Sequence, residues 1–247
     1  DNFWKIETQS ENYITEKLIL ATGSNPKIWE MLQTFGHAIV NPVPSLFTFN
    51  IKDARIKELP GVSSMVSVKV KDTKLASTGP LLITHWGISG PAILKLSAWG
   101  ARILAEKNYQ FTIFVNWLND IEAGDAEKIL KNLKQEHAKK GVSKKSPFDF
   151  PNRLWESLVL ASSISEETKW ADLSKIQLQN LIHQLTNSSF QVNGKSTFKE
   201  EFVTAGGIDL KEINFKTMES KLHENLFFAG EIINIDAVTG GFNFQNA

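Results

Sequence analysis

The sequence has no cysteine among its 247 residues. Disulfide bonds, thiolate metal sites and a Cys-x-x-Cys redox pair are therefore excluded from this segment. Long apolar runs are missing too, because no stretch approaches the ~20 residues that a membrane span requires. The first residues also lack the apolar core of a signal peptide. With 42% hydrophobic and 22% charged residues, the composition is that of an ordinary globular protein.

An excess of charge of either sign is also absent. Lys and Arg total 27, and Asp and Glu total 27 as well. No basic cluster alternates with aromatic residues, so we expect no nucleic-acid partner and no membrane partner. The pairs Lys139-Lys140 and Lys144-Lys145 form a local basic patch, which we interpret as a solvated helix end and loop.

Several motifs of known chemistry are missing. The chain has no Gly-x-Gly-x-x-Gly turn, because Gly206-Gly207 and Gly240-Gly241 lack the third glycine and the following helix pattern. It has no Gly-x-Ser-x-Gly nucleophile elbow and no Walker loop. The histidines show no metal-ligand spacing, so we expect no metal site.

The most informative segment that is present is the C-terminal stretch 226–247. An apolar run predicts a buried strand that stops at Gly230 and then presents one carboxylate, Glu231. The diglycine Gly240-Gly241 follows, where backbone can approach a flat ligand closely. A similar pattern occurs near the start, where an apolar strand from residue 18 ends in a turn at Gly23. Both short apolar runs are typical of buried parallel strands, so we expect them to lie side by side with Gly23 and Gly230 at the same edge.

Four segments together resemble the HI0933-like (YhiN-type) family of NAD(P)/FAD-dependent oxidoreductases. They are LILATGS (18–24), ITHWGISGPAILKLS (83–97), VTAGGIDLKEINFKTMESK (203–221) and LFFAGEIINIDAVTGGFNFQNA (226–247). The resemblance implies FAD as cofactor, possible use of NAD(P)H as electron donor, a small-molecule substrate and a cytoplasmic location. It also implies that this chain is an internal segment lacking the N-terminal dinucleotide fingerprint, and that the segment alone holds no FAD and is inactive.

The resemblance further implies which residues face the cofactor. The cofactor-binding set is Thr22, Gly23, Gly230, Glu231, Gly240, Gly241, Phe242 and Asn243. The candidates near the flavin or the substrate are Thr84, His85, Ser89, Gly90, Gly206 and Gly207. No catalytic acid or base is assigned. For both sets a purely structural role remains an alternative. In the first set this would be an ordinary strand-to-helix turn at Gly23, a capping or solvated carboxylate at Glu231 and a simple turn at Gly240-Gly241. In the second set it would be a loop fixed by its glycines, a structural histidine or a flexible crossover.

The expected fold is mixed α/β with inserts. We predict remnants of a Rossmann-type FAD-binding domain at both ends (1–44 and 206–247), a β-barrel-like middle domain (45–124 and 188–205) and a helical insert domain (125–187). The β region rests on alternating β-branched and aromatic residues. The insert rests on helical periodicity, and Ser174 and Gln177 before its third helix have capping-box spacing. The function this predicts is that of part of an FAD-dependent oxidoreductase. The alternative is a flavin-binding or protein-interaction module without catalysis.

Three local predictions can be compared with a structure directly. A helix should begin after Asn25, with Pro26 in its first turn and Gly36 at its end. The stretch Asn41-Pro42-Val43-Pro44 should break regular structure. The dipeptide Asn193-Gly194 should form a hairpin turn within the returning β segment.

Overall fold

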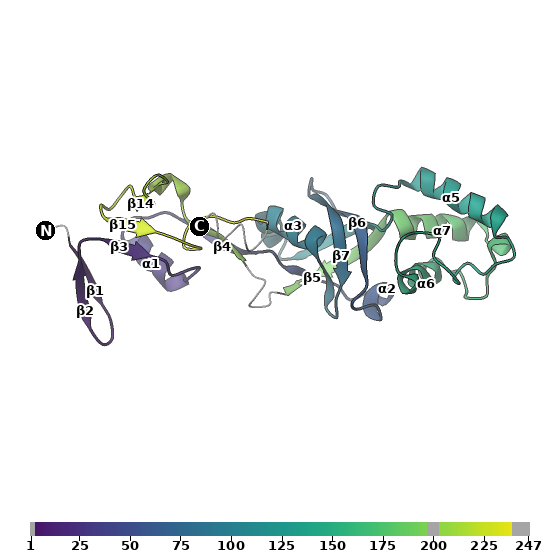
Figure 1. The fold of residues 1–247 in the computed structure, drawn as a ribbon, viewed down its shortest axis with the longest axis horizontal. Coiled ribbons are helices and arrows are strands. Elements are labelled where there is room, and N and C mark those ends of the chain that lie inside the picture. The colour runs from purple at the N-terminus through teal and green to yellow at the C-terminus, as the bar shows by residue number, and fades with distance from the viewer. Residues whose placement is uncertain (1–2, 197–202, 239–247) are drawn as a thin grey trace. The chain divides into compact units, whose positions relative to one another are not determined.

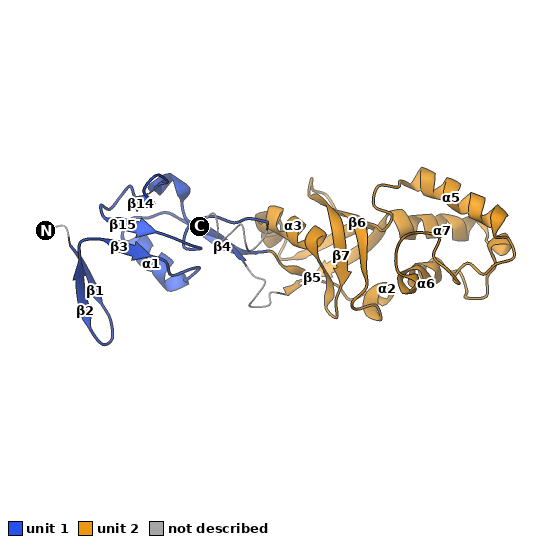
Figure 2. Cartoon of the chain, viewed as in Figure 1, with its two compact units in different colours: residues 1–45, 200–247 blue, residues 46–199 orange. Residues whose placement is uncertain are grey.

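A computed structural model describes residues 3–196 and 203–238 of the chain. The chain divides into two compact units (Figure 2). Unit 1 combines the two ends of the chain, residues 1–45 and 200–247, and unit 2 comprises residues 46–199. Both units combine helices and strands (Figure 1), so the mixed α/β class expected from the sequence is confirmed.

Within its described residues, unit 1 contains one α-helix, a 3₁₀ turn and three small sheets. Its elements are β1 (Trp4–Glu7), β2 (Asn12–Thr15), β3 (Leu18–Leu20), α1 (Pro26–Thr34), β4 (Ile39–Ser45), β12 (Val203–Ile208), η2 (Leu210–Glu212), β13 (Ile213–Asn214), β14 (Glu219–Ser220) and β15 (Leu226–Phe228). Strands β1 and β2 form a hairpin, β12 pairs with β4, and the third sheet has the order β13-β14-β15-β3.

The parallel pair β3–β15 joins the two ends of the chain. Leu226 lies opposite Leu18, and Phe228 lies opposite Leu20. The prediction that these two strands lie side by side is therefore confirmed. Leu226 and Phe228 are fully buried, whereas Ile19 on β3 is 66% exposed. Strand β3 is the edge strand of this sheet, which explains why its apolar run is less buried than its composition predicts.

Helix α1 begins and ends as the sequence predicts. The side chain of Asn25 accepts a hydrogen bond from the Lys27 amide, and Pro26 is the first helical residue. Gly36 follows the helix with φ +90°, a left-handed conformation that glycine adopts without strain. The helix buries Trp29 and Leu32 against the core of unit 1.

The expected break at residues 41–44 is wrong. These residues belong to β4, where Pro44 lies opposite Thr204 of β12. The two strands form a two-stranded sheet, so each has an open edge. Proline removes a ladder donor only on the side where its N–H would point, and an edge strand tolerates that loss.

Unit 2 contains one seven-stranded sheet and six α-helices among the described residues. Its strands are β5 (Thr48–Asn50), β6 (Ser63–Val70), β7 (Ala76–Ile83), β8 (Gly87–Ser89), β9 (Gln110–Asn116), β10 (Ser188–Asn193) and β11 (Lys195–Ser196). Its helices are α2 (Ala54–Lys57), α3 (Pro91–Trp99), α4 (Ala101–Glu106), α5 (Ala123–Glu136), α6 (Asn152–Ala161) and α7 (Lys175–Thr186), with a 3₁₀ turn η1 (Trp170–Asp172).

The two edges of the large sheet come from one stretch of chain. The strand order is β10-β9-β6-β7-β8-β5-β11. Strand β10 pairs with β9, as expected for the segment around Phe190, and β11 pairs with β5. Only Gly194 separates β10 from β11, with its N–H bonded to Tyr109 O and its own carbonyl accepting from Asn50 N. The hairpin prediction at Asn193-Gly194 is therefore wrong, because the chain bends there and continues to a new partner.

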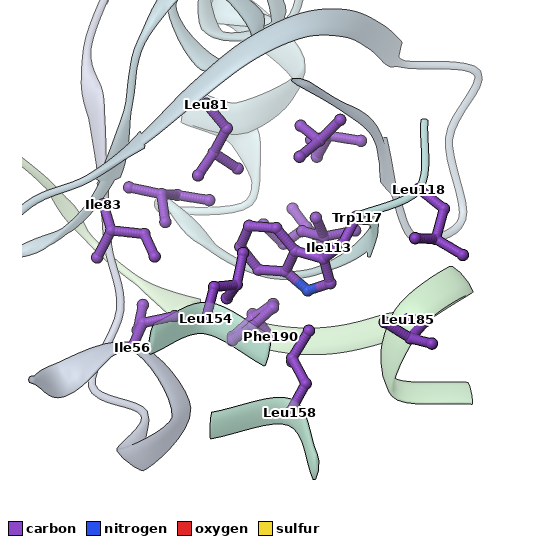
Figure 3. Packing of buried hydrophobic residues seen from close by; sticks show 14 of the residues in the cluster. Ile56, Leu81, Ile83, Ile113, Trp117, Leu118, Leu154, Leu158, Leu185 and Phe190 are labelled. Carbon is purple, nitrogen blue, oxygen red and sulfur yellow. The ribbon is translucent and has the colours of Figure 1, made fainter. Parts of the chain in front are cut away.

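One hydrophobic core runs through the sheet and the helices of unit 2. Trp117, at the end of β9, packs among residues of the sheet and of the helical segment (Figure 3). Its indole N–H donates to Ser188 Oγ at 3.2 Å. Helix α7 begins with the expected capping box of Ser174 and Gln177. The finer division of residues 46–199 into a β domain and a helical domain stays a prediction.

Candidate functional site

Two glycine turns lie together where the parallel strands of unit 1 end. The Ala229 N–H donates to Leu20 O at 3.0 Å, which joins the ends of β15 and β3. Gly23 and Gly230 follow these strands with φ +64° and +83°. Among the described residues, a Cβ built at either glycine meets no heavy atom within 4 Å. The edge is thus formed by backbone in left-handed conformations with open space beside it, a geometry that lets a ligand approach closely.

A helix N-terminus follows the first of these turns. Thr22 is exposed, and the Asn25 N–H donates to Gly23 O at 2.9 Å just before α1 begins. The first amides of a helix carry partial positive charge and favour anions or oxygen acceptors nearby. Strand, glycine turn and helix therefore follow one another in the order that suits a ligand at the carboxyl end of a parallel sheet.

Glu231 presents a half-buried carboxyl group directly after the second turn. Burial raises the pKa of this carboxyl above its ordinary value. Within the described part of the chain it has no hydrogen-bond partner, although the backbone beside it is firmly held. Ile232 O accepts from Trp29 Nε1 at 2.9 Å and from Ile208 N at 3.0 Å. A fixed carboxyl group with open acceptor capacity is suited to bind hydroxyl groups.

The diglycine Gly206-Gly207 lets three backbone segments approach one another. A Cβ on Gly207 would lie 2.5 Å from Ile232 O, and one on Gly206 would lie 2.5 Å from Pro42 Cα. Both glycines have positive φ, at a register shift between β12 and β4. Because Gly207 contacts the backbone that follows Glu231, it supports that segment from behind. The structure therefore gives these two glycines a structural role, which is to allow close packing of backbone segments.

The other predicted cofactor residues lie outside the described residues. These are Gly240, Gly241, Phe242 and Asn243. Of the predicted cofactor-binding set, the structure therefore brings together Thr22, Gly23, Gly230 and Glu231 at one sheet edge.

The segment from Thr84 to Gly90 belongs to unit 2, where its glycines permit close packing. A Cβ on Gly87 would lie 2.1 Å from Phe49 O, so this residue lets β8 pair with β5. Gly90 has φ +92° and stands immediately before α3 as its N-cap. Buried Ser89 accepts a hydrogen bond from Thr48 Oγ1 at 2.9 Å. The glycine spacing in this motif is thus explained by the fold of unit 2.

Two side chains of the same segment face a hollow of about 410 Å³. Thr84 Oγ1 accepts a hydrogen bond from the Gly87 amide at 3.2 Å, which stabilises the turn of residues 84–87. His85 is exposed and makes no hydrogen bond within the part of the chain that the structure describes. Both line the hollow beside Asp53 and the start of α2. His85 is free to contact a ligand there, which keeps it a candidate.

A buried polar cluster in unit 1 was missed by sequence reasoning. His37 Nδ1 lies 2.8 Å from Glu212 Oε2, and His37 Nε2 lies 3.1 Å from Ser220 Oγ. The partners are 175 and 183 residues away from His37, so no local spacing could have revealed them. The one local feature that could have drawn attention to His37 is its position directly after Gly36, the glycine that ends α1.

Searches for two other kinds of site gave no candidates. Over residues 3–196 and 203–238, no three His, Asp or Glu side chains gather in a way that could hold a metal ion. Over the same ranges, every helix is too short or too polar to cross a membrane.

Comparison with known proteins finds similarity over nearly the whole chain. A family model described as "HI0933-like protein barrel and H2TH domain" matches residues 43–203, more than half of the chain. The chain is 29% identical over 250 residues to a "Ribosomal RNA dihydrouridine synthase" of Haemophilus influenzae, covering 97% of this chain and 59% of that protein. The protein of the same name from Escherichia coli is 28% identical over 243 residues, covering 93% and 57%.

A third relative carries a different name. It is a "3-dehydro-bile acid delta(4,6)-reductase" of Clostridium scindens, 23% identical over 251 residues, covering 97% of this chain and 61% of that protein. The chain thus spans about three fifths of the length of the curated relatives it matches.

Proposed function

The chain belongs to the HI0933-like family, and from this premise we propose that it is part of an FAD-dependent reductase. The observation that carries the proposal is the sheet edge of unit 1. Gly23 and Gly230 offer open backbone there, and α1 presents its N-terminus. Glu231 stands beside them with its carboxyl group half-buried and without a described partner.

The residues of this edge fit a dinucleotide with several hydroxyl groups. In the proposal, Glu231 accepts hydrogen bonds from the ribityl hydroxyls of FAD, while Thr22 and Gly23 contact the cofactor through the first turn. Gly230 leaves room for it, and Gly240, Gly241, Phe242 and Asn243 complete the set. FAD supplies hydride chemistry when bound, with NAD(P)H as electron donor. The chain's own part is to bind and orient the cofactor.

The names of the relatives favour one reaction class. Dihydrouridine differs from uridine by two hydrogens across a ring double bond conjugated to a carbonyl. A delta(4,6)-reductase acting on a 3-oxo steroid also reduces a double bond of that kind. We infer that the whole protein reduces a carbon–carbon double bond conjugated to a carbonyl, with net addition of one hydride and one proton.

For the substrate class, RNA is favoured over a small molecule. Both relatives at 28% and 29% identity are named for ribosomal RNA, whereas the bile-acid reductase is 23% identical. The balanced composition predicted no nucleic-acid partner, and the proposal revises that expectation. A small unsaturated carbonyl compound is the second candidate.

The test uses the full-length protein of which this chain is a part. We expect a yellow protein whose visible absorption bleaches under anaerobic conditions when NADPH or NADH is added. A colourless protein would reject the flavin proposal. A yellow protein that no nicotinamide reduces, and that reduces neither uridine in RNA nor an unsaturated ketone, would favour the alternative of a flavin-binding or interaction module without catalysis.

A further inference from the structure

A group of exposed lysines gathers on the helical part of unit 2. The lysine surface consists of Lys139, Lys140, Lys144 and Lys145 in the loop between α5 and α6, together with Lys169. An antiparallel bridge pairs Gly141 with Lys169, which brings the fifth lysine next to the loop. All five side chains are exposed. The sequence contains no Asp or Glu from residue 137 to residue 148.

The charges of the lysine surface are not neutralised by ion pairs. Earlier in α5, Lys128 pairs with Asp125 at 2.9 Å and Lys131 pairs with Glu127 at 2.7 Å. Within the described residues, none of the five lysines of the surface has such a pair. Lysines Lys128 and Lys131 of α5 are therefore ion-paired with carboxylates, whereas the lysines of the surface after α5 are not.

Three of these lysines surround one hollow. Lys140, Lys144 and Lys145 line it together with His137 and Trp170, and its volume is about 360 Å³. Its lining contains no acidic residue. Glu166 lies on the other side of Lys144, where both border a separate hollow. The lysine surface therefore presents a concave region of one charge sign.

Backbone hydrogen bonds hold the loop in this shape. Trp170 N donates to Lys140 O at 3.0 Å, and Ala171 N donates to Ala138 O at 3.0 Å. Val142 N donates to Thr168 O at 2.9 Å, and buried Trp155 donates its indole N–H to Val142 O at 2.8 Å. A loop fixed in this way loses little entropy on binding, which favours it as a docking surface over a flexible lysine tail.

We propose that the lysine surface docks the phosphate backbone of an RNA substrate. Clustered lysines without carboxylate partners attract phosphates and release counterions on binding, which gives affinity without reading the sequence. The choice of RNA rests on the proposed function, because that proposal names RNA as the substrate. The surface itself stands on the charge and shape of residues 137–145 and 168–171. The balanced net charge of the chain conceals this surface, because residues 137–148 contain no Asp or Glu and no acidic residue lines the hollow.

The test measures binding of a fluorescein-labelled RNA hairpin to the chain by fluorescence anisotropy. The variant combines Lys139→Gln, Lys140→Gln, Lys144→Gln and Lys145→Gln, all at exposed positions. We expect its Kd to rise at least about tenfold, and the slope of log K against log salt to shrink by about three between roughly 50 and 200 mM salt. The matched control combines Lys52→Gln, Lys57→Gln, Lys71→Gln and Lys74→Gln, which removes the same charge from exposed lysines of the same unit.

Three outcomes would overturn the proposal. One is an equal loss of RNA affinity in the control variant, which would mean that the net charge of the chain, and not this surface, determines RNA binding. Another is unchanged hairpin binding by the variant. The third is equally tight, lysine-dependent binding of heparin or of phosphatidylserine vesicles, which would assign the surface to polyanions in general or to a membrane. The visible spectrum of the full-length protein separates the two proposals: a colourless protein with lysine-dependent RNA binding would reject the flavin and retain this surface.

Discussion

His37 Nδ1 and Glu212 Oε2 lie 2.8 Å apart and connect the end of α1 to the 3₁₀ turn after β12. Glu212 also accepts from the Ala38 amide through both carboxylate oxygens, at 3.2 and 3.1 Å. The His37 ring is buried and packs edge-on against Phe228 of β15. This pair therefore ties the N-terminal and C-terminal parts of unit 1 together beside its parallel strands.

Replacing this histidine should destabilise unit 1. His37→Ala removes one hydrogen-bond partner from the Glu212 carboxylate and one from the buried Ser220 hydroxyl, and it opens space beside Phe228. We expect a loss of about 2 kcal/mol in unfolding free energy, seen as faster hydrogen exchange in residues 18–45 and 203–235. The control is His85→Ala, an exposed residue that should change little. Unaltered exchange in unit 1 would show that the pair contributes nothing to stability.

Two glycine-to-alanine substitutions should change the free energy of unfolding in opposite directions. Gly207→Ala places a Cβ 2.5 Å from Ile232 O at φ +128°, so the segment behind Glu231 has to move. We expect it to cost at least about 2 kcal/mol, because both overlap and backbone strain contribute. Gly124→Ala lies within α5 with nothing near its Cβ and should stabilise by up to about 1 kcal/mol. Urea denaturation of both variants checks the pair, and equal effects would contradict the packing role of Gly207.

The pKa of Glu231 predicts a pH-dependent effect of removing its charge. Burial raises the pKa of this carboxyl above the ordinary glutamate value of 4.5. The unfolded state therefore releases the proton at lower pH than the folded state does. The free energy of unfolding falls as pH rises from the unfolded-state pKa through the folded-state pKa. Glu231→Gln should be more stable than the wild-type chain at pH 7 and equal to it below about pH 4. Thermal unfolding across this range tests the sign, and a variant less stable at pH 7 would refute it.

The same residue should govern cofactor retention in the full-length protein. Hydrogen bonds to a charged acceptor contribute about 1.5–3 kcal/mol, so Glu231→Ala should weaken FAD binding about ten- to a hundredfold. Excess FAD should then restore much of the activity, and Glu231→Asp should lose less. Normal FAD content together with absent turnover would instead identify Glu231 as a catalytic acid or base.

Asp53 should stabilise unit 2 in a pH-dependent way. Burial alone raises the pKa of Asp53, but the hydrogen bonds and charge of Arg55 outweigh this effect and hold the pKa below the ordinary aspartate value of 3.8. The folded state therefore favours the ionised form. Its stabilising effect is present above pH 3.8 and disappears as pH falls through the folded-state pKa. Asp53→Asn should thus be less stable at pH 7, with the difference shrinking in acid, as followed by urea midpoints. A difference independent of pH would contradict the ion pair.

Local signals in the sequence predicted local structure well. The cap at Asn25, the capping box of Ser174 and Gln177, and the strand ending at Gly230 all depend on a few neighbouring residues. Predictions failed where distant partners decide the outcome. The prolines of β4 are tolerated because β12, about 160 residues later, supplies a two-stranded sheet with open edges. Gly194 bends a strand because two different neighbours, β9 and β5, are available on its two sides.

The candidate site likewise combines residues that local sequence patterns identify with residues whose roles depend on distant partners. Gly23 and Gly230 could be singled out because each ends an apolar run, and their pairing followed from the rule that parallel strands end at one edge. Trp29 holds the backbone after Glu231 through a contact across 203 residues, and Gly207 holds it from a strand about 25 residues earlier, so neither role follows from local spacing. The lysine surface was visible as a run of charge, but its shape comes from the bridge to Lys169.

The division of unit 1 between the two ends of the chain sets an order of events during synthesis. Strand β3 is synthesised before unit 2, yet its parallel partner β15 begins about 200 residues later, and Trp29 contacts Ile232, 203 residues further along the chain. Residues 46–199 are synthesised in between and contain their own core. Unit 2 can therefore fold before β3 and α1 meet their partners in residues 203–238, and loop closure by unit 2 lowers the entropic cost of joining these two parts of unit 1.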